Sequence, residues 1–462
     1  MFPTGSARPI AAAAIVAFAA AVPAAGQQAS TADVDKMMAV IAAQQQQLDA
    51  MRAELDALKA DRTVAEAPRP APPAAVAPAA PATLAAASTV AASPDEDDRT
   101  EAQMVAEGFT WVDKSGRSLT LSGQVNPAFN VVNDGVSTDV FIVDNDTSGS
   151  RFRLDADAPL GQTSIGATLE IKASPNNSYD VSQLDAQTDP DFDVQRAEVT
   201  FRDDRYGRLQ LGKGSSAADD TAEYDLSLVA GPIMYAGVAD IAGGIIFTDG
   251  TELANFGTPD DPVYVTVGDA FFDFDGDRLA RIRYDSPMFG PVQGSVSYGQ
   301  DDQWAAAVTL GGDYGDWSGW TVGNFTMLAA ASVYNPDDDS VDYGYAASAS
   351  VLHDPTGLSL TLSTGGYKLD EGDDPANVYA KIGWDTAFWE LGPTGFGIDY
   401  TSGENIAGEG SDGTSYGIAA VQRIGPYDID LYAQLRRYEL DGTSGPDLKN
   451  ITVGTFGTKF VF

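Results

Sequence analysis

Cysteine is absent from this chain of 462 residues, and histidine occurs only once. Without cysteine the protein can form no disulfide, no thiol nucleophile and no cysteine-ligated zinc site. The single histidine, His353, lies in the sequence His353-Asp354-Pro355, which is typical of a tight turn, and no nucleophile motif accompanies it. We therefore predict that the protein is not an enzyme and needs no cofactor.

Basic residues are also scarce. The chain has 27 lysines and arginines against 67 aspartates and glutamates, which gives a net charge of −40. This balance argues against nucleic-acid binding, which needs a basic face. Outside the N-terminus, no apolar run reaches the roughly 18 residues of a membrane-spanning helix. The acidic residues are typical of exposed loops or of life at high salt.

The N-terminus has the pattern of a secretory signal peptide. Arg8 is the only charge before Asp33, and an unbroken apolar run occupies residues 10–22. Small residues at 24–26 offer a cleavage site, so we predict that residues 1–26 form a signal peptide. The alternative is a retained membrane anchor.

Residues 27–63 carry a heptad repeat, which predicts a periplasmic coiled coil. Its seam steps alternately by three and four residues and has one polar member: Val34, Met37, Ile41, Gln44, Leu48, Met51, Leu55 and Leu58. A helix this short is marginal alone, so we expect copies to pack in a parallel oligomer. The alternative is a single amphipathic helix lying on the next domain. Residues 64–107 are rich in alanine and proline and predict an extended linker.

From Leu119 onward the pattern changes to strands of period two, broken by Gly, Asn, Asp and Pro. A soluble β-sandwich and a transmembrane barrel both produce such alternation. The chain ends in an aromatic strand, with Phe456, Phe460 and Phe462 on one face. With the signal peptide and the density of strands, this ending favours an all-β fold, a transmembrane antiparallel β-barrel of about 16 strands over residues 108–462. Fourteen or eighteen strands would also fit.

Short and long connections alternate along this barrel region. The short ones include 203–207, 286–290, 353–357 and 425–428, and they are typical of periplasmic turns. The longest connection, about 214–277, follows a strand centred on 209–211, the fifth strand in our count. A loop this long in a compact barrel is usually functional.

Two stretches of the barrel region resemble the trimeric general porins of Gram-negative bacteria, most closely the alphaproteobacterial type. They are Ser150-Arg-Phe-Arg-Leu-Asp-Ala-Asp-Ala-Pro-Leu-Gly161 and Arg196-Ala-Glu-Val-Thr-Phe-Arg-Asp-Asp-Arg-Tyr-Gly-Arg-Leu-Gln-Leu-Gly212. The terminal Phe462 matches the assembly signal of that family. The N-terminal extension departs from the simplest porins and is similar to that of the trimeric DcaP-type channels.

The resemblance implies a homotrimer in the outer membrane, in contact with lipid and lipopolysaccharide, and implies that the barrel assembly machinery recognises the C-terminal strand. It also implies that the third outer loop folds into each pore. The loop acids at the constriction would be Asp219, Asp220, Glu223 and Asp225. The opposite basic wall would comprise Arg151, Arg153, Arg196, Arg202 and Arg208, with Arg281 and Arg283.

The residues themselves support an aqueous interior. A charged side chain on the lipid face costs about 2–4 kcal/mol near the midplane, so the arginines on strands should point inward. Some of them could instead pair with acids to brace the barrel. The acidic stretches 273–277 and 337–339 could hold Ca²⁺, although neither continues into a complete calcium loop and both also fit solvated loops.

Taken together, these features predict a passive diffusion channel for ions and small hydrophilic solutes. The alternatives are a substrate-specific channel, for example for dicarboxylates, a protein that tethers the outer membrane, and a barrel enzyme that depends on His353. The N-terminal extension could reach peptidoglycan. The sequence does not decide which sign of charge the channel prefers.

Overall fold

The computed structural model describes residues 108–258, 261–312, 318–338, 340–443 and 445–462. The chain divides into two compact units, Met1–Ser93 and Pro94–Phe462, and every described residue belongs to the second. The predicted signal peptide, coiled coil and linker lie outside the described residues.

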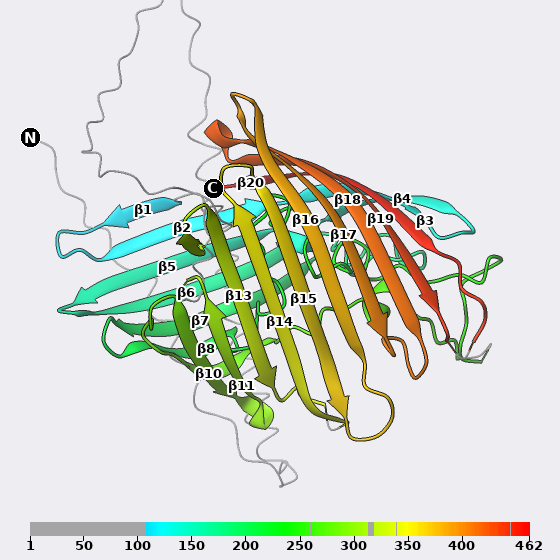
Figure 1. Cartoon of the computed structure of the whole chain (residues 1–462), viewed down its shortest axis with the longest axis horizontal. Helices are drawn as coiled ribbons and strands as arrows, with labels where there is room; N and C mark the ends of the chain where they lie inside the picture. The colour runs from blue at the N-terminus through cyan, green and yellow to red at the C-terminus, as the bar shows by residue number, and fades with distance from the viewer. Residues whose placement is uncertain (1–107, 259–260, 313–317, 339, 444) are drawn as a thin grey trace, which may run out of the picture. The chain divides into compact units, whose positions relative to one another are not determined.

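The described chain consists almost entirely of antiparallel strands (Figure 1). Their bounds are β1 (Phe109–Val112), β2 (Ser118–Val125), β3 (Pro127–Asn133), β4 (Thr138–Asp144), β5 (Arg151–Leu160), β6 (Thr163–Ser174), β7 (Asp191–Asp203), β8 (Gly207–Ser215), β9 (Arg278–Asp285), β10 (Val292–Gly299), β11 (Trp304–Leu310), β12 (Trp320–Val322), β13 (Phe325–Tyr334), β14 (Val341–His353), β15 (Leu358–Leu369), β16 (Ala376–Trp389), β17 (Gly392–Glu404), β18 (Asp412–Ile424), β19 (Ile429–Asp441) and β20 (Ile451–Val461).

These segments occupy sixteen positions around a barrel, because four pairs of them are collinear. β2 continues into β3 past Asn126, and β4 and β5 pair successively along that joint strand. β11 and β12 both pair with β13. β1 lies on the same edge of β2 that β20 occupies further along. The prediction of about 16 strands is therefore confirmed.

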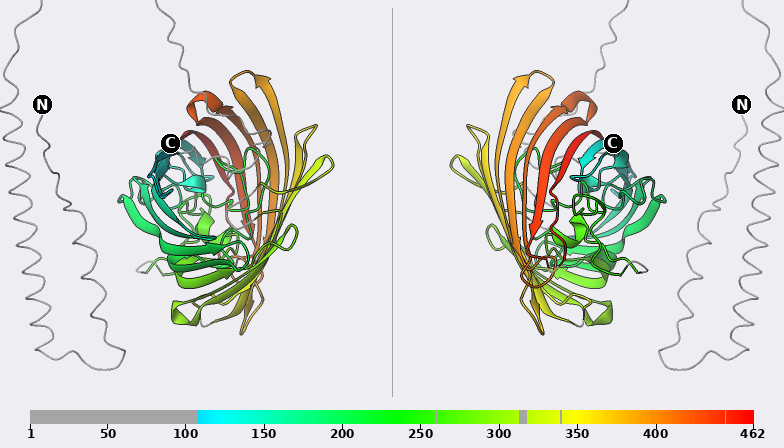
Figure 2. Two further views of the ribbon diagram at one scale, coloured as in Figure 1. Left: turned by 90° about the vertical axis from the view of Figure 1, so that its left-hand side faces the viewer. Right: turned by 90° about the vertical axis from the view of Figure 1, so that its right-hand side faces the viewer.

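The C-terminal strand closes the barrel. β20 pairs with β3, and its last residues reach β2. The Phe462 N–H donates to the Gly123 carbonyl at 2.9 Å, and the Gly123 N–H donates back to Phe462 at 2.7 Å. Closure leaves no long sheet edge, as a strand structure in lipid requires. Figure 2 shows the strands curving around a filled interior.

Apolar side chains point outward and polar ones inward, as β15 illustrates. Leu358, Leu360 and Leu362 are exposed, whereas the intervening Ser359 and Thr361 are buried. This is the inverse of a soluble β-sandwich and fits lipid outside the barrel. No helix in the described parts of the chain is long and apolar enough to cross a membrane.

The connections alternate in length as predicted. Turns of a few residues join β7 to β8, β9 to β10, β14 to β15 and β18 to β19. His353 lies at one of these turns, with its Nδ1 2.8 Å from the Thr356 hydroxyl. The longest connection is residues 216–277, between β8 and β9. β8 is the fifth strand position, so both the place and the approximate length of this loop match the prediction.

Residues 216–277, called the interior loop here, fold into the barrel and build an apolar core there (Figure 2). The loop contributes Val229, Ile233 and Phe247, and the inner face of the wall contributes Val421 and Tyr438. Its short helix α2 (Val267–Ala270) is stabilised by a capping box between Thr266 and Asp269. Part of the barrel interior is therefore apolar, whereas the sequence analysis predicted an aqueous interior lined by charged residues.

Candidate functional site

The principal cavity in the described part of the chain lies between one side of the barrel wall and the interior loop. Its volume is about 940 Å³, and it is lined by residues from β2, β5, β6, β7 and β8, and by the loop. The loop's apolar core packs against residues of β3, β4, β16 and β18–β20. The cavity therefore lies beside this core, along the part of the wall that β2 and β5–β8 form.

Five arginines of the wall line this cavity, and we call them the wall arginines: Arg151, Arg153, Arg196, Arg202 and Arg208. Strand alternation directs them inward. Phe152 and Leu154 are exposed on the outer face of β5 on either side of Arg153, and Leu209 is exposed next to Arg208. Each of these five was predicted from sequence as a pore-wall residue.

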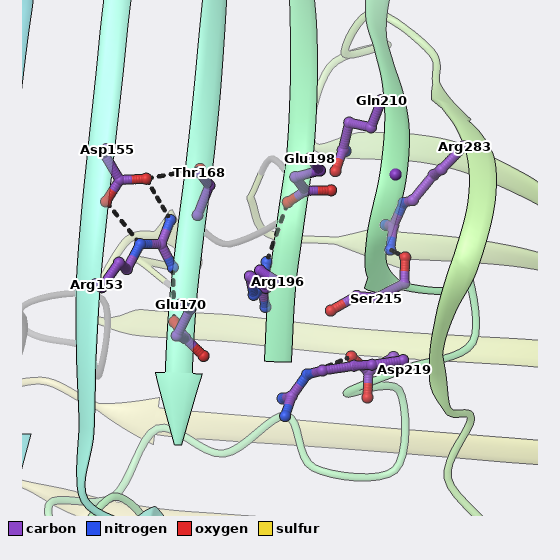
Figure 3. A network of polar contacts seen from close by, with 12 residues as sticks. Arg153, Asp155, Thr168, Glu170, Arg196, Glu198, Gln210, Ser215, Asp219 and Arg283 are labelled. Carbon is purple, nitrogen blue, oxygen red and sulfur yellow. Dashed lines mark hydrogen bonds and ion pairs between the residues drawn. The ribbon is translucent and has the colours of Figure 1, made fainter. Parts of the chain in front are cut away.

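Carboxylates on the same wall pair with most of these guanidinium groups (Figure 3). The Nε of Arg153 lies 2.7 Å from Asp155, and its Nη1 lies 3.4 Å from Glu170. Glu170 also lies 3.8 Å from Arg151. Arg196 lies 3.9 Å from Glu198. The wall is thus a lattice of alternating charges rather than a purely basic surface.

Arg208 also pairs with a carboxylate of the wall. Its Nε lies 2.9 Å from the buried carboxylate of Asp285, the last residue of β9.

Arg281 and Arg283 do not line the cavity, unlike the wall arginines. Both are almost fully buried, at 3% and 1% exposure. Arg281 pairs with Glu198 at 2.6 Å and donates to the Ser215 carbonyl at 2.9 Å. Arg283 pairs with Asp285 at 2.8 Å and donates to the carbonyl of Ser216. The two guanidinium groups therefore bind carbonyls at the point where β8 ends and the interior loop begins.

Of the four loop acids named from sequence, Asp219, Asp220 and Glu223 line the cavity and Asp225 does not. The Asp225 carboxylate lies 2.6 Å from the Lys381 ammonium on β16, and both side chains are buried. Lys381 also donates to the Met234 carbonyl at 2.6 Å. Asp225 therefore anchors the loop to the far wall and does not face the aqueous space.

Four further acids of the loop line the cavity: Asp240, Asp273, Asp275 and Asp277. With Asp219, Asp220 and Glu223 they form a set of seven that we call the cavity acids. The sequence analysis interpreted the stretch 273–277 as a calcium ligand set or a solvated loop, and it did not single out Asp240. A usable signal was present, because residues 216–277 contain thirteen aspartates and glutamates and no lysine, arginine or histidine.

Burial, together with neighbouring carboxylates, raises the pKa values of several cavity acids. Burial and the neighbouring charge of Asp219 raise the pKa of Asp220 to about 6, against the opposing effect of Arg278, Arg196 and Arg283. Burial and the surrounding aspartates also raise the pKa of Glu223 well above its usual value. These carboxyl groups therefore keep their protons to a higher pH than isolated carboxyl groups do.

Three of these carboxylates come close enough to share a cation. Ligand oxygens of Asp219, Asp220 and Asp275 lie within 4.8 Å of one another. They already have partners, however: Arg278 Nε lies 3.2 Å from Asp219, and Asp275 accepts the Ala222 N–H at 2.9 Å. Calcium binding here stays a prediction. The other acidic stretch, 337–339, ends at a residue outside the described chain.

Wall side chains hold the interior loop by its carbonyl groups. Asn145 donates to Pro232 at 2.9 Å, and Asn130 donates to Ile241 at 2.6 Å. Gln434 and Tyr438 donate to the carbonyls of Ile233 and Val238, respectively. Because a buried carbonyl without a partner is costly, these contacts fix the loop against the wall.

The terminal residue, predicted as an assembly signal, lies at the barrel seam. The ring of Phe462 is 6.0 Å from that of Phe152 and 5.9 Å from that of Phe460. Phe456 and Phe460 are exposed on the outer face, whereas Lys459 points inward and is buried. The last strand thus covers the seam with aromatic side chains.

Comparison with solved structures finds porins of low sequence identity. The anion-selective porin from Comamonas acidovorans is 16% identical, covers 75% of this chain and 100% of its own, and gives a TM-score of 0.49. OmpF of Salmonella typhi, in complex with daunomycin, is 11% identical over 77% and 100% of the two chains, with a TM-score of 0.49. The outer membrane channel DcaP of Acinetobacter baumannii is 13% identical over 77% and 100%, with a TM-score of 0.45.

Comparison with curated proteins gives no match. The family model described as Gram-negative porin, in contrast, matches residues 74–443, which is most of the chain. A closed barrel of sixteen strand positions, with an apolar exterior and a charged cavity inside, agrees with that match. The chain therefore belongs to the Gram-negative porin family, whose members are outer-membrane channels for small solutes.

Proposed function

We propose that this porin is a passive diffusion channel for ions and small hydrophilic solutes, and that the cavity beside the interior loop is its constriction. The observation that carries the proposal is the composition of the cavity walls. Wall arginines line one side and the cavity acids line the other. A narrow aqueous gap between charged walls selects solutes by sign and dipole.

The mechanism follows from this geometry. A solute that enters the gap exchanges part of its hydration shell for hydrogen bonds to carboxylates and guanidinium groups. The apolar core of the loop blocks the rest of the lumen, so the solute must pass through the charged side. Low-dielectric surroundings concentrate the field in such a gap, and polar solutes turn their dipoles along it. Apolar solutes gain nothing there and lose hydration.

We further propose that the channel is a homotrimer that contacts lipopolysaccharide and is assembled through its C-terminal strand. The heptad repeat of residues 27–63 supports trimerisation on the periplasmic side, where the extension could also contact peptidoglycan. Deleting residues 27–92 would test both ideas. Unchanged trimer stability and unchanged envelope contacts in the deletion variant would contradict them.

Single-channel recording of the purified protein in planar bilayers tests the function directly. We expect large, open current steps that occur in groups of three. Absence of steps in a correctly folded preparation would refute a diffusion channel and favour the tether. Small currents that one anion saturates or blocks would instead favour a substrate-specific channel.

A further inference from the structure

The second strand position of the barrel is interrupted between β4 and β5. β4 ends at Asp144 and β5 begins at Arg151, so the six residues 145–150 separate them. On the neighbouring joint strand, only residues 125 and 126 lie between the partners of Asp144 and Arg151. Six residues thus stand opposite two, whereas an ordinary β-bulge adds a single residue. We call residues 145–150 the inward bulge.

The inward bulge points into the lumen and not toward lipid. Asp146, Thr147, Ser148 and Gly149 line the cavity, and every residue of the bulge is buried or half-buried. The sequence of the bulge, Asn145-Asp-Thr-Ser-Gly-Ser150, contains no apolar side chain that could face lipid. Irregular backbone at membrane depth is tolerated only where protein or a water-filled cavity surrounds it, which is the case here.

Side chains of the neighbouring strand hold the bulge in a fixed shape. The Gln124 side chain donates to the carbonyls of Ser148 at 2.6 Å and of Gly149 at 2.9 Å. The Asn126 side chain donates to the carbonyls of Asn145 at 3.3 Å and of Ser148 at 3.1 Å. Because these carbonyls lie outside the strand ladder, the two amides satisfy groups that would otherwise be buried without a hydrogen bond. The bulge is therefore a well-anchored part of the wall.

The bulge is also joined to the interior loop. The Asn145 side chain donates to the Pro232 carbonyl at 2.9 Å. Ser178, in the connection between β6 and β7, accepts the Asp146 N–H at 2.9 Å and donates to the Asp240 carbonyl. Both the bulge and the loop line the same cavity, so these contacts fix the position of one relative to the other.

We propose that the inward bulge is a second element of the constriction and that, together with the interior loop, it sets the largest solute that can pass. The inference rests on the proposed diffusion function and adds to it a size-determining element carried by the barrel wall. Bulges beside functional sites are typically built features that redirect side chains. An element carried by a strand is also held more precisely than one carried by a loop.

Deleting residues 146–149 tests the proposal directly. The deletion leaves two residues opposite two and, because it removes an even number, keeps the inward and outward alternation of β5. We expect larger current steps and, in liposomes, faster swelling with large neutral sugars relative to small ones. Unchanged steps and an unchanged sugar cut-off in a folded barrel would refute the size-determining role and leave the diffusion function intact. Absence of steps in the folded wild type would refute the function itself.

A labelling experiment does not depend on whether the deletion variant folds. The wild type has no cysteine, so Thr147→Cys introduces the only thiol, at a residue that lines the cavity and whose hydroxyl has no hydrogen-bond partner within the described chain. We expect neutral methanethiosulfonates to reduce the current steps of T147C, with a greater loss for the benzyl than for the methyl reagent. The wild type should respond to neither reagent.

Thr251→Cys is the matched control for this labelling. Thr251 belongs to the interior loop but is exposed and lies outside the cavity lining, so T251C should be labelled without loss of current. Mass spectrometry of both folded variants checks the extent of labelling. A T147C variant that the methyl reagent cannot label, or one whose current is the same before and after labelling, would overturn the inference.

Discussion

Replacing Lys381 with methionine would leave the buried Asp225 carboxylate without its cation. The two groups lie 2.6 Å apart and have 0% and 1% exposed side chains. Removing one partner of a buried ion pair costs about 3–5 kcal/mol, because the remaining charge has neither water nor a counter-ion. The Met234 carbonyl would also lose its donor. We therefore expect Lys381→Met to destabilise the attachment of the interior loop to β16.

Two measurements report this loss. The folded barrel should convert to the unfolded form at lower temperature or urea concentration, as its mobility on detergent gels shows. Single-channel currents should become noisier and larger, because a loop released from β16 no longer blocks that side of the lumen. The double variant Asp225→Asn with Lys381→Met removes both charges and should recover most of the stability, since replacing a whole buried pair is often neutral.

Lys368→Met is the matched control. Lys368 lies 2.9 Å from Asp374, but both side chains are about half exposed. Such surface pairs contribute about 0–1 kcal/mol, so this variant should resemble the wild type. If Lys381→Met were as stable and as quiet as Lys368→Met, or if the double variant were no better than the single one, the anchoring role of this pair would be refuted.

Two further predictions concern pH and the C-terminus. Because the pKa of Asp220 is raised to about 6, this group gains a proton as the pH falls from 7.5 to 5, so the cation-to-anion permeability ratio should decrease over that interval, and a constant reversal potential under a salt gradient would contradict this. Deleting Phe462 removes two backbone hydrogen bonds to Gly123 and a ring contact with Phe152, so the yield of folded barrel should fall, whereas Phe462→Tyr should retain it. Equal folded yields for the deletion and the substitution would argue against a role at the seam.

The strands were predictable because each carries its own signal. Period-two alternation with breaks at Gly, Asn, Asp and Pro defines a strand without knowledge of its neighbours. The position of the interior loop followed for the same reason, since residues 216–277 interrupt the alternation after β8. The inward direction of the wall arginines followed from parity and from the cost of charge in lipid. These inferences need only the local sequence and the assumption that lipid surrounds the barrel.

The partners of the charged groups were not predictable in this way. Asp225 and Asp220 belong to the same acidic stretch, yet one pairs with Lys381 on β16 and the other lines the cavity. Arg281 and Arg153 both occupy inward positions on strands, yet Arg281 is covered by the loop. Which acid or arginine faces water depends on how the loop folds across the lumen. That is a property of contacts between residues far apart in sequence.

The apolar core of the interior loop determines where these charges matter. Phe141 and Val143 point into the lumen, while Val140 and Ile142 are exposed on the outer face of β4. A strand that is apolar on both faces must cover its inner face, and the loop does so with Val229, Ile233 and Phe247 among others. Burial of this core holds the loop against these strands, while the cavity acids line the gap that the wall arginines also line. The apolar residues on the inner face of the wall thus position the charged gap as much as the charged residues themselves do.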